Sequence, residues 1–355
     1  MDTTGFSEQQ YRQDEGTVFD YLCVDSFMKT VVEARALTTA FELRLIDYLS
    51  ENQANTLDDF KKGFAGDDRG LQFLLNLLRE NRVIEEDNGT VKLSQEFQQA
   101  LQYRDLLEAK LEFAHFVLPD FSDLFTALIT SPDQFGPNSR TFKLFCYQRS
   151  FEYSPENYEL TKRWVRITTA LTRYEAVVCL QYHDFSRYRR ILDIGGNSGE
   201  FVLRICKNYP SIHATVLDLP LVCQVGLEHL RSEPEAERIS FIEGNALADE
   251  LPKDFDLISF KSMLHDWPDN EAKQFIARAS QSLQPGGTLL IFERGPIEVG
   301  QTTLPYSMIP FLLFFRSFRS PIVYREQLET LGFQDIEIQR IELEMPFYLV
   351  TAKKM

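Results

Sequence analysis

A chain of 355 residues is long enough for two domains, and its 44% hydrophobic residues suffice for a full core without disulfide or metal staples. The 53 acidic side chains outnumber the 37 basic ones, and the formal net charge of -16 repels the phosphates of nucleic acid and of anionic lipid. Composition therefore argues against nucleic acid as a main partner.

The cysteines and the N-terminus bear on compartment and metal binding. Five cysteines are scattered along the chain without a C-x-x-C pair or clustered histidines, which fits reduced thiols better than disulfides or a zinc site. The N-terminus is polar and acidic, unlike a signal peptide. The longest uncharged run, residues 299–315, is too short for a membrane span and contains two prolines. We expect a cytoplasmic protein with no metal site and no membrane segment.

Residues 18–93 have the outline of a winged helix. Apolar residues recur at helical spacing over 18–50, residues 56–60 and 67–78 fit short helices, and 81–93 fit a hairpin that turns at Asn88–Gly89. A winged helix suggests DNA binding, but residues 1–100 hold 10 Lys and Arg against 19 Asp and Glu. Because the helices of 18–50 carry more apolar positions than one face of a surface helix needs, we expect residues 1–105 to form a dimerisation domain.

Residues 106–185 are helical and rich in aromatic residues, and Pro119, Pro132, Pro137 and Pro155 are expected to interrupt the helices. The aromatic residues of this stretch, among them Trp164, fit a core or the wall of a pocket for a flat apolar ligand. We expect a helical linker that contributes to an acceptor pocket.

Short apolar strands alternate with helical patterns from residue 186 to the C-terminus. The expected strands are 191–194, 214–217, 239–242, 255–260 and 288–292, and this alternation predicts a doubly wound, Rossmann-like parallel sheet in domain 186–355. Two closing runs, 334–343 and 346–352, have no helix between them and predict an antiparallel hairpin at the sheet edge. The fold class is therefore α/β, preceded by a mostly helical domain.

A glycine turn follows the first strand of this sheet. The sequence from Asp193 reads D-I-G-G-N-S-G, a ligand-binding corner that lacks both the dinucleotide G-x-G-x-x-G and the phosphate-loop ending Gly-Lys-Ser/Thr. A tight turn without a ligand fits the glycines almost as well. Asp218 ends the second strand, 25 positions after Asp193, where a carboxylate can accept both hydroxyls of a ribose. Turn and acid together favour a nucleoside-bearing cofactor.

A histidine and an acid follow two later strands. His265 lies after the fourth strand, and Glu293 ends the fifth. Because adjacent parallel strands bring their C-terminal ends together, Glu293 can hold one imidazole nitrogen and leave the other free as a base. The alternative is that His265 is an ordinary polar residue in a loop before a helix.

These segments resemble the SAM-dependent small-molecule O-methyltransferases of the plant caffeate, hydroxyindole and bacterial polyketide type. The resemblance covers nearly the whole chain and is most specific in LHDWPDNEAKQFIARASQSLQPGGTLLIFE, then in ILDIGGNSGEF with VLDLP. It implies a homodimer that binds S-adenosyl-L-methionine (SAM) and releases S-adenosyl-L-homocysteine (SAH). It also implies that Asp218 holds the ribose, that Lys261 lies near the adenine, and that His265 deprotonates an acceptor hydroxyl with Glu293 in support.

The candidate site residues form three groups. The catalytic group is His265, Glu293 and Asp266; the cofactor group is Asp193, Gly195, Gly196, Gly199, Asp218, Leu219, Asn245, Ala246 and Lys261; the substrate-pocket group is Trp164, Met263, Met308, Phe311 and Phe315.

The chain departs from the family pattern at three places. Asn197 replaces a loop glycine, Gly244–Asn245 replaces Gly-Asp, and residues 316–325 lack the second supporting acid.

The expected reaction is transfer of the SAM methyl group to a hydroxyl of a flat aromatic small molecule of secondary metabolism. Two alternatives stay open: a relative that methylates carbon or nitrogen or uses SAM without methyl transfer, and a SAM-sensing winged-helix regulator. An intact His265 and Glu293 argue against the regulator, because a sensor needs no base. The sequence does not name the acceptor.

Overall fold

The computed structural model describes residues 25–51, 55–56, 61–62, 67–87, 90–297 and 308–355, and the chain divides into two compact units, 1–99 and 100–355. Each unit is described by itself. Among the described residues, no helix has the length and apolar character that crossing a membrane requires.

The first unit combines helices with a small sheet. Its helices include α1 (Asp25–Glu42), α2 (Leu45–Glu51) and α4 (Asp68–Glu80), and its strands β1 (Asn55–Thr56), β2 (Ile84–Asp87) and β3 (Thr90–Leu93) lie in the order β1-β3-β2. Helix α4 forms because leucines recur on one face; this face, Leu71, Leu74, Leu75 and Leu78, is buried. Strands β2 and β3 pair antiparallel. Thr56, expected at the start of a helix, is in β1, while residues 18–24, 57–60 and 88–89 lie outside the described residues.

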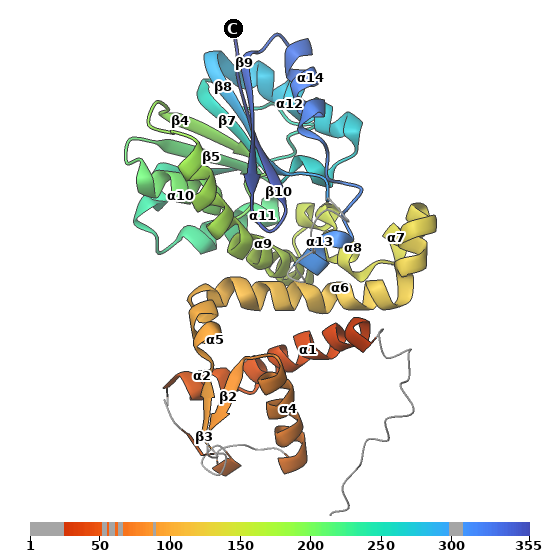
Figure 1. Cartoon of the computed structure of the whole chain (residues 1–355). Helices are drawn as coiled ribbons and strands as arrows, with labels where there is room; N and C mark the ends of the chain where they lie inside the picture. Colours follow the sequence, from red (N-terminus) through yellow and green to blue (C-terminus); the bar gives the residue numbers. More distant parts are fainter. Residues whose placement is uncertain (1–24, 52–54, 57–60, 63–66, 88–89, 298–307) are drawn as a thin grey trace, which may run out of the picture. The chain divides into compact units, whose positions relative to one another are not determined.

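Long helices open the second unit (Figure 1). After α5 (Gln95–Ala100) come α6 (Arg104–Thr130), α7 (Pro132–Asn138), α8 (Arg140–Leu144), the 3-10 turn η3 (Tyr147–Phe151) and α9 (Pro155–Tyr182). The expectation that four prolines interrupt this stretch is only half right. Pro132 and Pro155 begin helices, where the missing N–H is not needed, but Pro119 and Pro137 lie inside α6 and α7.

A seven-stranded sheet of order β6-β5-β4-β7-β8-β10-β9 forms the body of the second unit. Its strands are β4 (Arg190–Ile194), β5 (His213–Asp218), β6 (Ile239–Glu243), β7 (Phe255–Lys261), β8 (Leu283–Arg294), β9 (Gln334–Glu342) and β10 (Pro346–Lys353). Strands β4 to β8 are parallel, whereas β10 runs antiparallel to both β8 and β9. The strand order reverses between β4 and β7, so a crevice opens there at the carboxyl ends of the strands.

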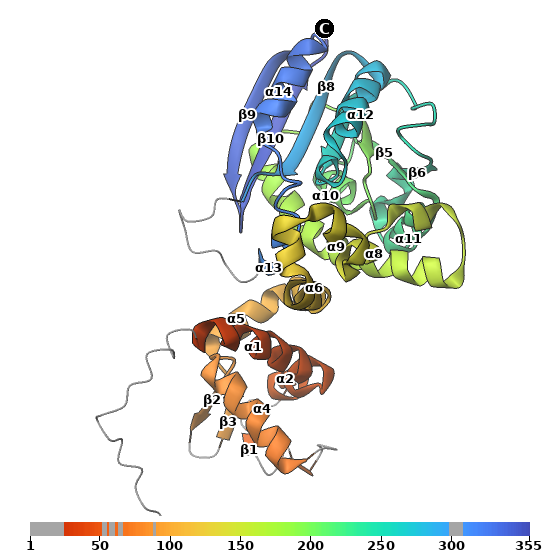
Figure 2. The same ribbon diagram turned by 90° about the vertical axis from the view of Figure 1, so that its right-hand side faces the viewer.

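Helices cover both faces of this sheet (Figures 1 and 2). They are α10 (Glu200–Asn208), α11 (Pro220–Leu230), α12 (Asp269–Ser282) and α14 (Pro321–Thr330), whereas α13 (Ile309–Leu312) contacts α6. Successive strand residues point to opposite faces: Ile191 and Leu257 belong to the core under α9 and α10, and Leu192 and Ile258 to the core under α12 and α14. Burial on both faces explains why the central strands β4 and β7 are mostly apolar.

Candidate active site

A cavity of about 390 Å³ lies where β4, β5, β7 and β8 end, within the second unit. One part of its wall comes from the strand ends and the loops that follow them. The other part is aromatic and comes from α6, the end of α8, η3, α9 and the segment around α13; it includes Phe113, Phe145, Tyr147, Trp164, Phe311, Phe314 and Phe318. The cavity therefore joins polar groups at the sheet edge to an apolar cage.

The glycine turn forms the floor beside β4. Gly195 has a φ of 68°, and a Cβ on it would collide with the side chain of Met263. Asn197, in place of a family glycine, has a φ of 58°, a left-handed conformation that asparagine accepts more readily than most residues. Gly195 and Asn197 both line the cavity, so the turn leaves backbone open to a ligand.

Asp218, at the end of β5, is fixed by two backbone amides. Its Oδ2 accepts a hydrogen bond from the amide of Asn197 at 2.7 Å, and its Oδ1 accepts one from Leu219 at 2.7 Å. Burial raises the pKa of Asp218 to about 6, although both hydrogen bonds oppose that rise. A carboxylate with spare lone pairs at the cavity wall is suited to accept hydroxyl groups.

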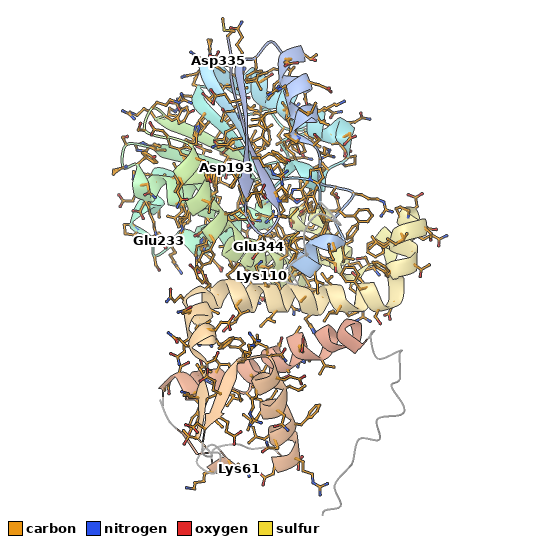
Figure 3. The ribbon with its side chains drawn as sticks, in the orientation of Figure 1. Lys61, Lys110, Asp193, Glu233, Asp335 and Glu344 are labelled. Carbon is orange, nitrogen blue, oxygen red and sulfur yellow. The ribbon has the colours of Figure 1, made fainter. Side chains whose placement is uncertain are left out.

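Asp193 lies in the body of the second unit (Figure 3) and does not line the cavity; a Cβ on Gly196 would collide with its carboxylate. Its Oδ1 accepts a hydrogen bond from the Ser259 hydroxyl at 2.6 Å, while Oδ2 is buried without a partner among the described residues. Burial raises the pKa of Asp193 to about 7, because the ionised form has too few partners.

His265 and Glu293 meet at the ends of β7 and β8. His265 Nδ1 lies 2.7 Å from Glu293 Oε2, and Glu293 Oε1 accepts the backbone amides of Met263 and Leu264, each at 2.7 Å. Burial would raise the pKa of Glu293, but His265 and these hydrogen bonds lower it. The ionised carboxylate thus holds both the imidazole and the loop that carries it.

Asp266 lies on the other side of the imidazole. Its Oδ1 is 3.4 Å from His265 Nε2, and its Oδ2 accepts the Tyr147 hydroxyl at 2.7 Å. Burial would lower the pKa of His265, but Asp266 and Glu293 outweigh it and raise that pKa. The imidazole is therefore flanked by one carboxylate on each nitrogen.

Lys261 and Arg294 are charged residues of the cavity wall, and both bind Glu175 of α9, which lies behind them and does not line this cavity. The Lys261 ammonium binds Glu175 and the Thr172 hydroxyl, the latter at 2.8 Å, and Arg294 binds the other oxygen of Glu175. Burial would raise the pKa of Glu175, but the two cations lower it. Strand β4 separates the strand of Lys261 from that of Asp218.

The structure brings together most of the residues predicted from sequence. The predicted residues in the cavity wall are Trp164, Gly195, Asp218, Leu219, Asn245, Ala246, Lys261, Met263, His265, Asp266 and Phe311. The predicted residues outside the wall are Asp193, Gly196, Gly199, Glu293, Met308 and Phe315. Glu293 still reaches the wall through His265, whereas Met308 is buried in the core and Phe315 is 37% exposed.

Sequence reasoning missed several residues of the site. Tyr147 belonged to an aromatic stretch with two open interpretations. Arg294 directly follows the predicted Glu293, so proximity in sequence was a usable signal for Arg294. Glu175 gave no signal, because its role depends on how α9 lies against the strand ends.

The missing second acid has a structural counterpart. The Phe318 ring lies 5.3 Å from the His265 ring, and Arg319 holds the loop that carries His265. The Arg319 guanidinium donates to the carbonyls of Leu264, at 2.7 Å, and Trp267, and to Asp269 at 2.6 Å. Residues 316–325, where the family pattern has a second acid, place the Phe318 ring and the Arg319 cation near His265 instead.

A doubly wound sheet with its cavity at the strand-order reversal is typical of α/β proteins that bind ligands at the carboxyl ends of strands. The chain belongs to the family described as the O-methyltransferase domain, which matches residues 128–334, more than half of its length.

Two relatives and one solved structure illustrate the similarity. Acetylserotonin O-methyltransferase of Bos taurus is 35% identical over 175 residues, 47% of this chain and 49% of that protein. 3-Hydroxy-5-methyl-1-naphthoate 3-O-methyltransferase of Streptomyces sahachiroi is 34% identical over 110 residues, 31% of this chain and 32% of that protein. Human N-acetylserotonin methyltransferase in complex with SAM has a TM-score of 0.73 at 19% identity and covers 96% of this chain and 99% of that chain, which shows a shared fold. The chain thus spans half or less of the length of the two relatives.

Proposed function

We propose that this protein transfers the methyl group of SAM to a hydroxyl of a flat aromatic small molecule, with His265 as the general base. The single observation that carries the proposal is the His265–Glu293 pair at 2.7 Å in a cavity that also contains a glycine turn and Asp218. Family membership supports the same reaction class.

The residues present fit SAM as cofactor. The open backbone at Gly195 and Asn197 would receive the ligand closely, and Asp218 would accept the ribose hydroxyls. Asn245 and Ala246, beyond β6, line the same cavity and would lie at the adenine side. When bound, SAM supplies a methyl group on a positively charged sulfur, which an oxygen nucleophile can displace.

The chain contributes a positioned base. Because Glu293 is ionised and accepts from Nδ1, the neutral imidazole carries its proton on Nδ1 and presents Nε2 as the acceptor. A phenol with a pKa near 10 is mostly neutral at pH 7, so a base within reach contributes roughly 10²- to 10⁴-fold to the rate. The raised pKa of His265 makes it a stronger base, and the carboxylates stabilise the imidazolium that forms.

The aromatic cage supports a flat, apolar acceptor. Phe113 packs against Phe145 at 5.6 Å and against Phe311 at 5.9 Å between ring centroids, and Trp164 lies 6.0 Å from Phe145. Rings in these tilted and edge-on contacts leave faces and edges on which another ring can stack. Holding such a ring with its hydroxyl next to Nε2 supplies the orientation that in-line transfer requires.

The first unit is proposed to serve in homodimer formation, with residues 1–105 as a winged-helix dimerisation domain, 106–185 as the acceptor-pocket region and 186–355 as the catalytic domain. Sedimentation equilibrium at micromolar concentration should give about twice the mass of the 41.2 kDa chain. A mass of one chain at that concentration would contradict the dimer.

The function is tested by incubating the protein with methyl-labelled SAM and an extract of its producing organism, then identifying the labelled product. We expect the labelled methyl group to be bonded to an oxygen of an aromatic ring in the product, and SAH to be released. A labelled methyl group on carbon or nitrogen would show that the acceptor atom is not the oxygen proposed. Tight binding of SAM with no labelled product would favour a sensor, and His265→Gln would then leave every measured property unchanged.

A further inference from the structure

The acid beside the proposed base has two competing partners. The carboxylate of Asp266 accepts the Tyr147 hydroxyl through Oδ2 at 2.7 Å, and its Oδ1 lies 3.4 Å from Nε2 of His265. The first contact is a full hydrogen bond, whereas 3.4 Å is longer than an ordinary N–H···O hydrogen bond. Asp266 is thus bound to the tyrosine and lies only near the nitrogen that would take the proton.

Tyr147 is held by contacts that do not depend on this hydrogen bond. Its ring packs edge-on against Trp164, with 5.6 Å between the centroids, and stacks on Trp267 at 6.1 Å. Arg149 of the same turn, η3, donates to two carbonyls at the end of α8, at 2.8 and 3.2 Å. These contacts fix the ring, so the hydroxyl is held in place as a donor to Asp266.

The Tyr147 hydroxyl keeps its proton, so it stays a donor. Burial and then the Asp266 charge hold the pKa of Tyr147 well above its usual value of 10.0, and Asp218 and Glu293 act in the same direction. Burial also raises the pKa of Asp266, while His265 and the Tyr147 hydrogen bond oppose that rise. The tyrosine therefore stabilises the ionised form of Asp266.

The other charged groups around the pair do not compete for this carboxylate. Glu293 of β8 takes Nδ1 of the His265 imidazole at 2.7 Å, which leaves Nε2 to other partners. Arg294 of the same strand lowers the pKa of both His265 and Asp266. Arg319 binds carbonyls of the loop and an acid of α12. Of the groups described around the pair, Tyr147 is the one that competes with His265 for Asp266.

A carboxylate that turned fully to Nε2 would block the base. A protonated Nε2 would donate to it, and the imidazolium would then have a carboxylate on each ring nitrogen, which holds the proton tightly. Near neutral pH, such a ring could not accept the proton of an acceptor hydroxyl. Asp266 and His265 are neighbours in sequence, so the distance between them depends on what holds the acid.

We propose that Tyr147 is a positioning residue that keeps the base available: by binding Asp266, it holds this carboxylate away from Nε2 of His265. The tyrosine takes no proton and acts through the acid. The proposal rests on the proposed function, in which Nε2 accepts the proton of the acceptor. It also gives a reason why a tyrosine hydroxyl in an otherwise aromatic and apolar part of the cavity wall binds a carboxylate.

The first test follows the imidazole itself and needs no acceptor. The chain has five histidines, and in a histidine-labelled sample the NMR signal of His265 is the one that His265→Gln removes. In Tyr147→Phe the Asp266 carboxylate loses its donor, so His265 should bind its proton about tenfold more tightly, the effect of one hydrogen bond to a charged group. The midpoint of the His265 titration should therefore move to higher pH.

Two further variants make this result specific. Asp266→Asn removes a negative charge beside the imidazole, so the midpoint should move to lower pH. Adding Tyr147→Phe to Asp266→Asn should then change the midpoint no further, because the tyrosine acts through the acid. Tyr153→Phe is the matched control: Tyr153 is 68% exposed and lies outside the cavity wall, and this variant should titrate like the wild type.

The second test follows the reaction, with labelled SAM and the acceptor that the labelled product identifies. Below the midpoint of the wild type, kcat/KM of Tyr147→Phe should be about tenfold lower, because less of the base is free. At high pH, where His265 is deprotonated in both proteins, the two values should agree within about twofold. A merely structural role would lower kcat/KM at every pH.

Three results would overturn this role of Tyr147. They are an unchanged or lowered midpoint in Tyr147→Phe, an undiminished effect of that substitution in the Asp266→Asn background, and a loss of kcat/KM that is the same at every pH. The proposed function fails separately: if the midpoint moves as expected but labelled SAM transfers no methyl group, Tyr147 still restrains Asp266 and the methyltransferase proposal falls.

Discussion

Asp218 should make the binding of the cofactor depend on pH. Its carboxylate, fixed by the amides of Asn197 and Leu219, would accept the ribose hydroxyls only when it is ionised. With a pKa raised to about 6, half of it is protonated at pH 6 and about nine-tenths at pH 5. The SAH dissociation constant should therefore rise about twofold from pH 8 to pH 6 and about tenfold by pH 5.

Replacing Asp218 separates this effect from other titrations. Asp218→Ala loses charge-assisted hydrogen bonds of about 1.5 to 3 kcal/mol, so binding at pH 8 should weaken roughly 10- to 150-fold. The same variant should show almost no pH dependence down to pH 5. Glu243→Gln is the matched control, because Glu243 ends β6 opposite Asp218 but is exposed and lies outside the cavity wall.

Isothermal calorimetry with SAH between pH 5 and pH 8 measures both effects, and adenosine provides a ligand without an amino-acid group that titrates. Adenosine should show the same slope as SAH, since the ribose is common to both. A flat profile in the wild type, or an equal slope in Asp218→Ala, would refute the assignment of the ribose to this carboxylate.

Other variants test the base, its support and the turn. His265→Gln should lower turnover about 10²- to 10⁴-fold with SAH affinity unchanged, and Glu293→Gln should lower it less, as measured by initial rates with labelled SAM; a wild-type rate in the first would make the histidine structural. Arg319→Met should lower kcat about tenfold more than it changes KM and shift the pH profile, with partial rescue by Arg319→Lys, because it positions the loop by three hydrogen bonds. The pKa of Asp193 is raised from 3.8 to about 7 in the folded protein, so the folded state binds its proton more tightly than the unfolded state does. This contribution to stability is complete below pH 3.8 and is lost as the pH rises through about 7. Asp193→Asn should therefore raise Tm relative to the wild type more at pH 8 than at pH 5; an equal difference at both pH values would contradict this.

The sheet could be predicted from sequence because its strands are buried on both faces. Runs such as 191–194 and 255–260 are mostly apolar, so their positions followed from the sequence pattern, and the residues that follow each strand were thereby placed at one edge. The cavity residues Gly195, Asp218 and His265 were found in this way. What made them predictable is the parallel topology, which collects the strand ends.

The charged wall could not be predicted by the same reasoning. Glu175 lies in the C-terminal third of the 28-residue helix α9, where an acid is usually solvated, and its contacts with Lys261 and Arg294 arise from the way α9 lies along the strand ends. Phe315 was a candidate for the pocket on composition, yet Phe314 lines the cavity instead. The short segment around α13 gives no periodic pattern long enough to decide which neighbour faces inward.

The arrangement around His265 suggests how the site can work without an acid in residues 316–325. Asp266 is the neighbour of His265 in sequence and flanks its Nε2, so in the proposed mechanism the acid and the base would belong to one loop rather than to two distant segments. Tyr147 fixes the orientation of that acid, and Arg319 fixes the loop itself. Because Asp266 and His265 lie on the same loop, a displacement of that loop would change the distance of both groups to the acceptor. The distance between Asp266 and His265 would change little. Precision at the site would then depend on what holds the loop, which is why substitutions of Arg319 and Tyr147 should act on kcat although neither residue needs to take the proton.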